Sequence, residues 1–337
     1  MTEGPGDSGL QRSLAFAVIG GCALLCALIV VAVATGAVSL GWREVMDALS
    51  GGADPVTKGI VRELRLPRVL LAALVGSALA VSGGALQGTL RNPLAEPYLL
   101  GVSGGAAVGA VLAVVLGAGH PLAVTAAAFG GAAAASLLVS GLAHVADSQG
   151  DTRVLLTAGV VVGAFANAVI LVALADAPPD RVRGALWWMM GSVSDADWGS
   201  VGRAALALVL LGGALIWHAR SLDVIALGPD AAAALGIDVP RTTRHAYLVA
   251  SWLAAATVAS AGLVGFVGLV VPHLARALGA RHHRSLLLVS ALYGALLLVA
   301  ADLAARTVRA PAELPLGAVT AMIGVPFFLL RLRRGAA

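Results

Sequence analysis

Apolar runs long enough to cross a lipid bilayer recur along almost the whole chain. The first, 14–37, contains no charged residue and exceeds the roughly 20 residues that a helix needs to span the hydrocarbon core. Hydrophobic residues make up 59% of the 337 residues and charged residues only 12%, about half the usual share. A soluble domain of this length would need more polar surface. The sequence therefore predicts an all-α, polytopic membrane protein.

We expect about ten membrane-spanning helices in a single membrane domain, 14–334, preceded by a disordered polar tail, 1–13. After the first run, the spans are expected at 69–90, 102–116, 121–145, 154–174, 200–219, 245–264, 265–279, 285–301 and 316–330. Between the fifth and sixth spans, Asp176–Trp198 has polar ends and an aromatic pair, Trp187 and Trp188. This pattern is typical of an amphipathic helix at the membrane interface.

Small residues recur every four positions in the second span, at Gly76, Ala80, Gly84 and Gly88. Such a stripe lets another helix approach closely, which is how helices pack in lipid. The next segment, 91–101, reads RNPLAEPYLLG and interrupts the apolar run with two prolines and two opposite charges. Backbone groups freed by proline cannot face lipid, so we expect this segment to be buried in protein or to line a wet cavity.

The longest interior stretch that cannot lie in lipid is 222–244, LDVIALGPDAAAALGIDVPRTTR. Pro229 suits the first position of a helix, Asp230 suits its positive first turn, and Gly236 can end it. We expect one short helix here and a second that begins near Pro240. Two small helices outside a membrane bundle can form a handle for a partner protein, and an ordinary solvated loop is the alternative.

Ten spans place both termini on the same side of the membrane. With the termini inside, the inner segments hold 12 of the 22 basic residues, which agrees weakly with the positive-inside rule. The basic residues on the outside include Arg65, Arg68 and Arg306. They are expected to meet an acidic partner or to snorkel to lipid phosphates. For Arg306, an ion pair with Asp302 on the same helix face is a further alternative.

The chain shows no nucleophile with its base, no metal-ligand cluster and no phosphate-binding loop. Its one lysine, Lys58, lies outside any Gly-rich GK[ST] context, so another chain would have to hydrolyse ATP. The two thiols, Cys22 and Cys26, lie in the first apolar run and are expected to fill apolar space rather than bind metal. No clustered basic and aromatic surface suggests nucleic-acid binding. We therefore expect neither an enzyme nor a chain with its own cofactor.

Two polar residues, His273 and Asn167, are expected inside the spans. Each can form a helix-packing hydrogen bond or take part in transport. For His273 we favour packing, and for Asn167 both roles remain open. The carboxylates of Asp302 and Glu96 fall near span ends, so none is expected at mid-membrane. This counts against the main alternative, a secondary carrier coupled to ions without an ATPase.

Several motifs, in order, resemble those of the permease subunits of type II ABC importers, the uptake family for iron–siderophore complexes, haem and cobalamin. They are RLPR at 65–68, SGGALQGTLRNPLAEPYLLGVSGGA at 82–106, WWMMGS at 187–192, ALGPDAAAALGI at 226–237, GLVGFVGLVVPHLAR at 262–276 and AELPLGAVTAMIGVPFF at 312–328. The resemblance covers nearly the whole chain from Arg65 onward. It implies a homodimer in the bacterial cytoplasmic membrane with both termini in the cytoplasm. It also implies a path along the dimer axis for a large metal chelate, with a ferric siderophore expected before haem or cobalamin.

The resemblance also implies roles for individual residues. Two cytoplasmic ATPase subunits, which bind ATP and Mg²⁺, would dock on Leu227, Gly228, Pro229, Asp230, Leu235 and Gly236. An extracytoplasmic binding protein would place acidic residues on Arg65, Arg68 and Arg306. The cytoplasmic gate and the path would include Asn92, Pro93, Leu94, Asp151, Thr152 and Asn167. The polar, acidic turn at Asp151 departs from the pattern of close relatives.

Overall fold

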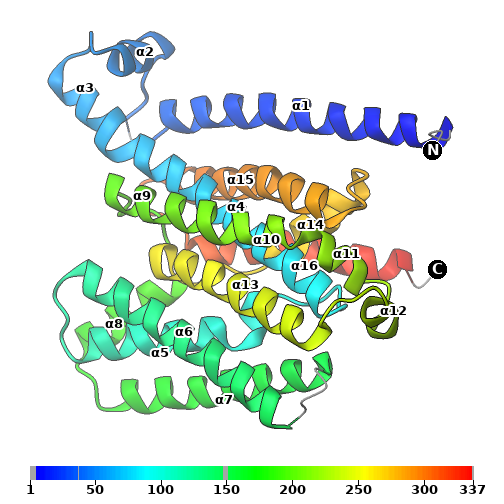
Figure 1. The fold of residues 1–337 in the computed structure, drawn as a ribbon. Coiled ribbons are helices and arrows are strands. Elements are labelled where there is room, and N and C mark those ends of the chain that lie inside the picture. The colour runs from blue at the N-terminus through cyan, green and yellow to red at the C-terminus, as the bar shows by residue number, and fades with distance from the viewer. Residues whose placement is uncertain (1–4, 37, 147–150, 336–337) are drawn as a thin grey trace.

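The computed structural model describes residues 5–36, 38–146 and 151–335, and within them the chain is helical, with no β-strand. Long helices lie side by side in a bundle (Figure 1). By length and composition, six helical stretches of the described residues could cross a membrane, and three shorter apolar helices accompany them. With α13, they form the ten expected spans. The predicted all-α membrane architecture is therefore confirmed.

The spanning helices are α1 (Pro5–Ala34), α4 (Leu66–Thr89), α5 (Val102–Val115), α6 (Pro121–Ala146), α7 (Thr152–Ala175), α9 (Trp198–Ala207) with α10 (Gly213–Trp217), α13 (Val239–Ala261), α14 (Val267–Ala277), α15 (His283–Thr307) and α16 (Leu316–Gly335). Two π-helical turns keep the chain helical, Ile60–Arg65 before α4 and Leu208–Gly212 between α9 and α10. The shorter helices are α2 (Trp42–Ser50), α3 (Pro55–Gly59), α8 (Pro179–Met190), α11 (Ala219–Ile225) and α12 (Pro229–Ala234). The helix α8 is the amphipathic one expected within Asp176–Trp198.

Two helix starts differ from the sequence-based expectation near the N-terminus. The helix α1 begins at Pro5, so the segment expected to be a disordered tail is helical from that residue on. The second span extends back to Pro55, whereas the sequence predicts its start at residue 69. There the Asp54 carboxylate accepts hydrogen bonds from two backbone N–H groups of the first turn, and this cap fixes the start of the helix.

The handle between α10 and α13 also differs in its boundaries. One short helix, α12, forms where it was predicted. The second is not near Pro240 but precedes α12 as α11. Pro240 instead lies in the first turn of the long helix α13, where the Asp238 carboxylate caps the helix by accepting from Arg241 N. Proline is tolerated in a first turn because its missing N–H would have no partner there.

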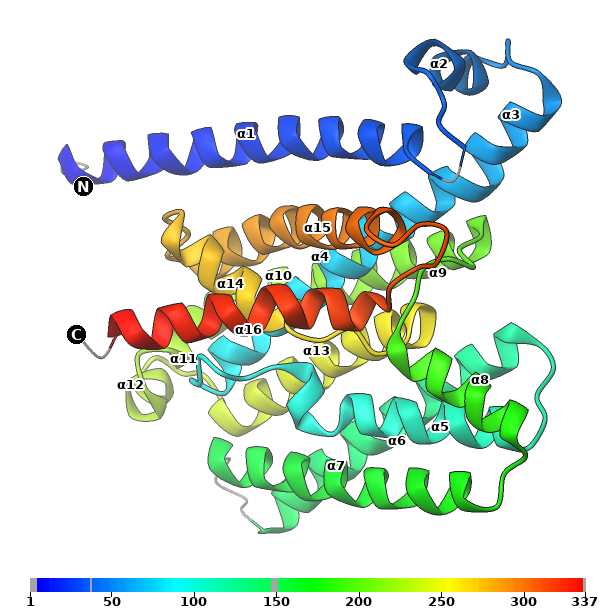
Figure 2. The same ribbon diagram turned by 180° about the vertical axis from the view of Figure 1, so that it is seen from behind.

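Both chain termini lie at the end of the bundle that carries α12, and α2 and α8 lie at the opposite end (Figures 1 and 2). We call the end with α12 the inner end and the end with α2 and α8 the outer end. The ribbon thus agrees with an even number of spans.

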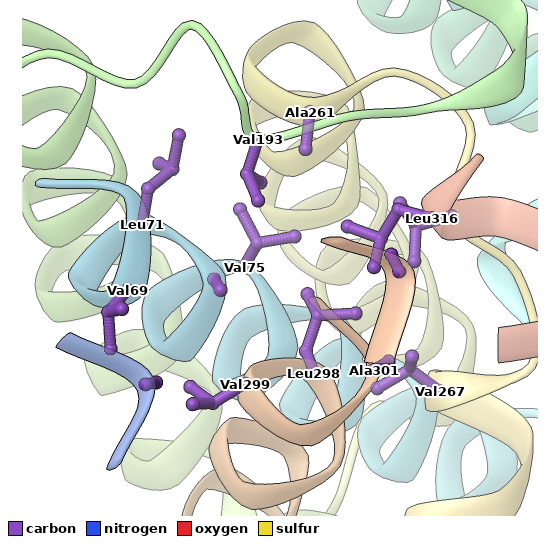
Figure 3. Packing of buried hydrophobic residues seen from close by; sticks show 14 of the residues in the cluster. Val69, Leu71, Val75, Val193, Ala261, Val267, Leu298, Val299, Ala301 and Leu316 are labelled. Carbon is purple, nitrogen blue, oxygen red and sulfur yellow. The ribbon is translucent and has the colours of Figure 1, made fainter. Parts of the chain in front are cut away.

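The helix α4 lies at the core of the bundle. In its span, 83% of the most apolar stretch is buried, whereas only 17% of the corresponding stretch of α1 is buried. The helix α15 packs closely along it because Gly76 and Gly294 meet backbone to backbone, and a side chain at either position would collide with the other. Around this contact Val75 of α4 lies near Leu298 of α15 (Figure 3). The small-residue stripe is confirmed as a helix-packing surface.

Candidate functional site

At the inner end, α12 forms for the reasons that its sequence predicts. Gly228 precedes the helix with φ of 115°, and Gly236 follows it with φ of 82°, two backbone conformations that favour glycine. Pro229 takes the first position of the helix. The two glycines and the proline therefore set the length of this short helix.

The helix α12 is anchored by one face and exposed on the rest. Ala232 is fully buried, whereas Asp230 is exposed. Leu227 and Leu235, which flank the helix, are 70% and 66% exposed. Large apolar side chains beyond the ends of the spanning helices are typical of a surface that another protein covers.

We call the stretch 222–244, which contains α12, the coupling segment. A pocket of about 460 Å³ lies between the coupling segment and the predicted gate. Its lining includes Arg91, Asp151, Thr152, Ile225, Pro229 and Val239. The inner turn at Asp151 and Thr152 therefore lines the same pocket as residues of α11 and α12. The Asp151 carboxylate also caps α7 by accepting from Arg153 N at 2.8 Å.

The segment 91–101, which holds the other gate residues, is fastened to α14. Asn92 Oδ1 accepts from Leu94 N at 2.9 Å and closes a tight turn. The carbonyl oxygen of Pro93 lies 2.9 Å from His273 Nε2. Because a carbonyl oxygen only accepts, Nε2 carries the hydrogen. The buried His273 thus makes a hydrogen bond between α14 and this segment, as the packing role that we favoured requires.

Two further polar contacts join this segment and the end of α4 to α14. Glu96, which is 7% exposed, accepts from Phe266 N at 2.6 Å. Arg276 Nη1 donates to Gln87 Oε1 at 2.7 Å. As the sequence predicts, Glu96 lies near span ends, between α4 and α5, and the structure buries it between two irregular stretches of backbone. Backbone that leaves helical geometry inside a bundle needs such partners.

Asn167 is exposed on α7 and shares a helix face with Leu171, four residues on, which is 70% exposed. Phe165, on a different side of the same helix, is 68% exposed. On α16, Met322 and Leu329 are also more than half exposed. Asn167 therefore does not serve the packing within this chain, and its predicted role in the path stays a prediction.

At the outer end, Arg65 is turned inward. It is 7% exposed, and its Nη1 donates to the carbonyl oxygens of Val33 and Ala34 at 2.8 Å each. Its Nη2 donates to Val38 O. A cation at the carbonyl end of α1 also interacts favourably with the helix dipole. Arg65 thus fixes the end of α1.

Arg306 and Arg68 meet at a buried carboxylate. Arg306 donates to two carbonyl oxygens at the end of α1, at 2.7 Å and 3.0 Å, and its Nε lies 3.4 Å from Asp302. Arg68 bonds Asp302 at 2.8 Å and Glu313 at 2.7 Å. The alternative of an internal ion pair for Arg306 is confirmed. The hydrogen bond from Arg68 holds the pKa of Glu313 below its usual range.

The structure therefore gathers the three arginines predicted for docking at one end, but their guanidinium groups bond this chain's own carbonyls and carboxylates. A guanidinium that is buried and bonded in this way, as in Arg65 and Arg306, presents little of itself to an incoming carboxylate, and the docking role of these two residues stays a prediction. Sequence reasoning missed Glu313 as the partner of Arg68. No local signal in the sequence links the two positions, which are 245 residues apart.

Comparisons with known proteins agree on the kind of protein. The model of the FecCD transport family matches residues 24–334. The cobalamin import system permease protein BtuC of Halobacterium salinarum is 44% identical over 286 residues, covering 85% of this chain and 76% of that protein. The Fe(3+) dicitrate transport system permease protein FecD of Escherichia coli is 38% identical over 317 residues, covering 94% of this chain and 96% of that protein.

A solved metal-chelate type ABC transporter in an inward-facing conformation has the same fold. It matches with a TM-score of 0.84 at 28% sequence identity, covering 94% of this chain and 98% of that chain.

Proposed function

Because this chain belongs to the FecCD transport family and is a type II ABC importer permease for metal chelates, we propose how its inner end is driven. A separate ATPase subunit docks on α12 and the exposed Leu227 and Leu235. The observation that carries this proposal is the pocket that residues of α11, α12 and the inner turn at Asp151 line together. Displacement of the coupling segment reaches the gate through this shared surface. ATP and Mg²⁺ bind to the ATPase, and this chain contributes no cofactor of its own.

We place the protein in the bacterial cytoplasmic membrane, with its inner end and hence both termini in the cytoplasm. Two copies form the transporter, with the exposed faces of α7 and α16 turned toward the dimer axis. This arrangement places Asn167 on the path, beside apolar side chains that bind a large chelate only weakly. Weak binding suits transport because the cargo must leave as readily as it enters.

An extracytoplasmic binding protein docks at the outer end, and Arg68 is the arginine that we assign to it. The support is its neighbour Glu313, whose side chain is 41% exposed. A carboxylate of the binding protein can replace Glu313 on Arg68 without uncovering Asp302. Arg65 and Arg306 hold α1 in place.

The first cargo to test is cobalamin. Its support is the 44% identity to a permease named for cobalamin import, which exceeds the 38% identity to the permease named for ferric dicitrate. A ferric siderophore, our expectation from the sequence, and ferric citrate come next, and haem last.

The test is uptake into proteoliposomes that contain this permease with its cognate ATPase and binding protein. Cobalamin, a ferric siderophore, ferric citrate and haem are each offered in labelled form, with and without ATP. We expect ATP-dependent uptake of cobalamin and of no other chelate. Uptake of one of the other chelates would replace cobalamin as cargo and leave the importer assignment standing. An absence of ATP-dependent uptake of every chelate would contradict the proposal.

A further inference from the structure

The coupling segment is fastened to α15 by a carboxylate on α11. Asp223 Oδ1 accepts a hydrogen bond from His283 N at 2.8 Å and lies 2.7 Å from His283 Nδ1. Because a carboxylate oxygen only accepts, Nδ1 carries a hydrogen and the ring presents Nε2 on its opposite side. His283 is the first residue of α15, and His282 before it offers no side-chain cap. Asp223 therefore supplies the N-terminal cap of α15 from a different helix.

The same imidazole ring is held by α4 from its other side. The ring is 10% exposed. A side chain at Gly88 would collide with His283 Nε2, so the ring occupies the space that this glycine leaves open. His283 thus lies between α11 and α4 at the point where α15 begins. The stripe residue Gly88 serves this contact rather than backbone-to-backbone packing.

From this joint, α15 runs to the outer end. It has 25 residues and is therefore about 37 Å long at 1.5 Å per residue. It is locked to α4 near its middle by the contact between Gly76 and Gly294, and near its outer end by the ion pair between Arg68 and Asp302. The helices α4 and α15 therefore form one rigid pair, and Asp223 is bonded to its inner end.

We propose that Asp223 and His283 form the joint that passes movement of the coupling segment to the α4–α15 pair. This inference rests on the proposed function, because it assumes that an ATPase moves α12. Both are positioning residues that act through α15 rather than on cargo or nucleotide. A displacement of α12 reaches α11 directly, and the two bonds to Asp223 make α15 follow. Without the joint, ATP would still be hydrolysed, but less of the movement would reach the bundle.

The chain provides a matched control next to the joint. His282 carries the same side chain but is 84% exposed, and its Nδ1 lies 3.8 Å from Asp223 Oδ2. A second pair is found on α4. At Gly84 an added Cβ would lie 3.2 Å from the flexible end of Leu287, a contact that a small movement relieves, whereas at Gly88 it would displace the ring of His283.

The experiment measures chelate molecules transported per ATP hydrolysed by the complete transporter in proteoliposomes. We expect His283→Ala and Gly88→Ala each to lower this ratio by about tenfold, within the range known for mutations that disturb coupling between sites. His282→Ala and Gly84→Ala should stay within about twofold of the wild type by the same measure. The variant His283→Asn, whose amide nitrogen can take the place of Nδ1, should restore most of the ratio.

The amount of ATPase that co-purifies with each variant separates coupling from folding. If His283→Ala fails to assemble, Gly88→Ala decides. Alanine favours the helix, and in this variant Asp223 and His283 are not themselves substituted. A wild-type ratio in an assembled His283→Ala or Gly88→Ala transporter would overturn the joint and leave the proposed function intact. Equal losses in His282→Ala and His283→Ala would also overturn it. A wild-type permease that binds no ATPase would instead contradict the proposed function.

Discussion

The two ends of the bundle use their side chains in opposite ways. At the outer end, Arg65 and Asp302 are 7% and 2% exposed, and the charged groups are bonded within the chain. At the inner end, Leu227 and Leu235 are 70% and 66% exposed. A group that its own chain already satisfies has little left to offer a partner. The buried charged groups of the outer end thus stabilise the bundle, and among them the pair of Arg68 with the partly exposed Glu313 is open to a partner. The exposed leucines of the inner end are available to the ATPase that we propose.

The largest effect should come from Asp302→Ala. The substitution leaves the buried Arg306 without a carboxylate and Arg68 with Glu313 alone, and breaking a buried pair in this way costs about 3–5 kcal/mol. We expect little folded protein, and a much lower thermal unfolding midpoint in detergent for what is recovered. The matched change at the inner end, Asp230→Ala, should leave the midpoint unchanged. Equal thermal midpoints for the two variants would contradict the claim that charged groups stabilise the fold at the outer end but not at the inner end.

Next in size is Arg65→Ala, which leaves the carbonyl oxygens of Val33 and Ala34 without their donor. Leaving buried polar groups unsatisfied costs about 1–3 kcal/mol, so the thermal midpoint should fall. The control is Arg43→Ala on the exposed face of α2. A variant at Arg65 that keeps its midpoint but loses binding of the extracytoplasmic protein would restore the docking role that the sequence predicted.

A smaller effect, confined to the partner, is expected for Leu235→Ala. An exposed side chain contributes little to folding, but truncating one of the few side chains that anchor a protein interface costs more than about 1 kcal/mol. Affinity for the ATPase should fall by about tenfold with no change in thermal midpoint. Leu116→Ala, at an outer-end leucine that is 81% exposed, is the control. Equal ATPase affinities for the two variants would show that α12 does not carry the contact.

The smallest effect concerns Glu313 and pH. Its pKa is lowered in the folded protein by the hydrogen bond from Arg68, so the bond stabilises fully above the ordinary glutamate pKa of about 4.3 and is lost as the pH falls through the lowered value. Partial exposure screens the interaction, so the change is small. Below about pH 4.3, the midpoint of the wild type should fall more steeply than that of Glu313→Gln. Parallel curves would contradict the assignment of this pair.

Features that depend on local residue patterns could be predicted from the sequence. Apolar runs set the number and order of the spans because about 20 apolar residues are needed to cross the bilayer. The proline and two glycines around α12 predict that helix, since each residue fits its position by backbone geometry alone. The stripe that includes Gly76 predicts close packing for the same reason.

The sequence could not show which distant residues meet. The ion pair between Arg68 and Glu313 joins positions 245 residues apart, and the bond between Asp223 and His283 joins positions 60 apart. Nothing in local spacing distinguishes an arginine that awaits a partner from one that already has its carboxylate. The same limit applies to the burial of Glu96, because that burial depends on Phe266, which lies far along the chain.

The central claim is that this chain is a passive permease moved from its inner end by a separate ATPase. The most direct test reconstitutes it in liposomes with and without that ATPase and measures uptake of labelled chelate delivered by the binding protein. The account predicts uptake only with the ATPase and ATP present, and greatly reduced uptake when Leu227 and Leu235 are both replaced by alanine. Uptake by the permease alone, driven by an ion gradient, would contradict it.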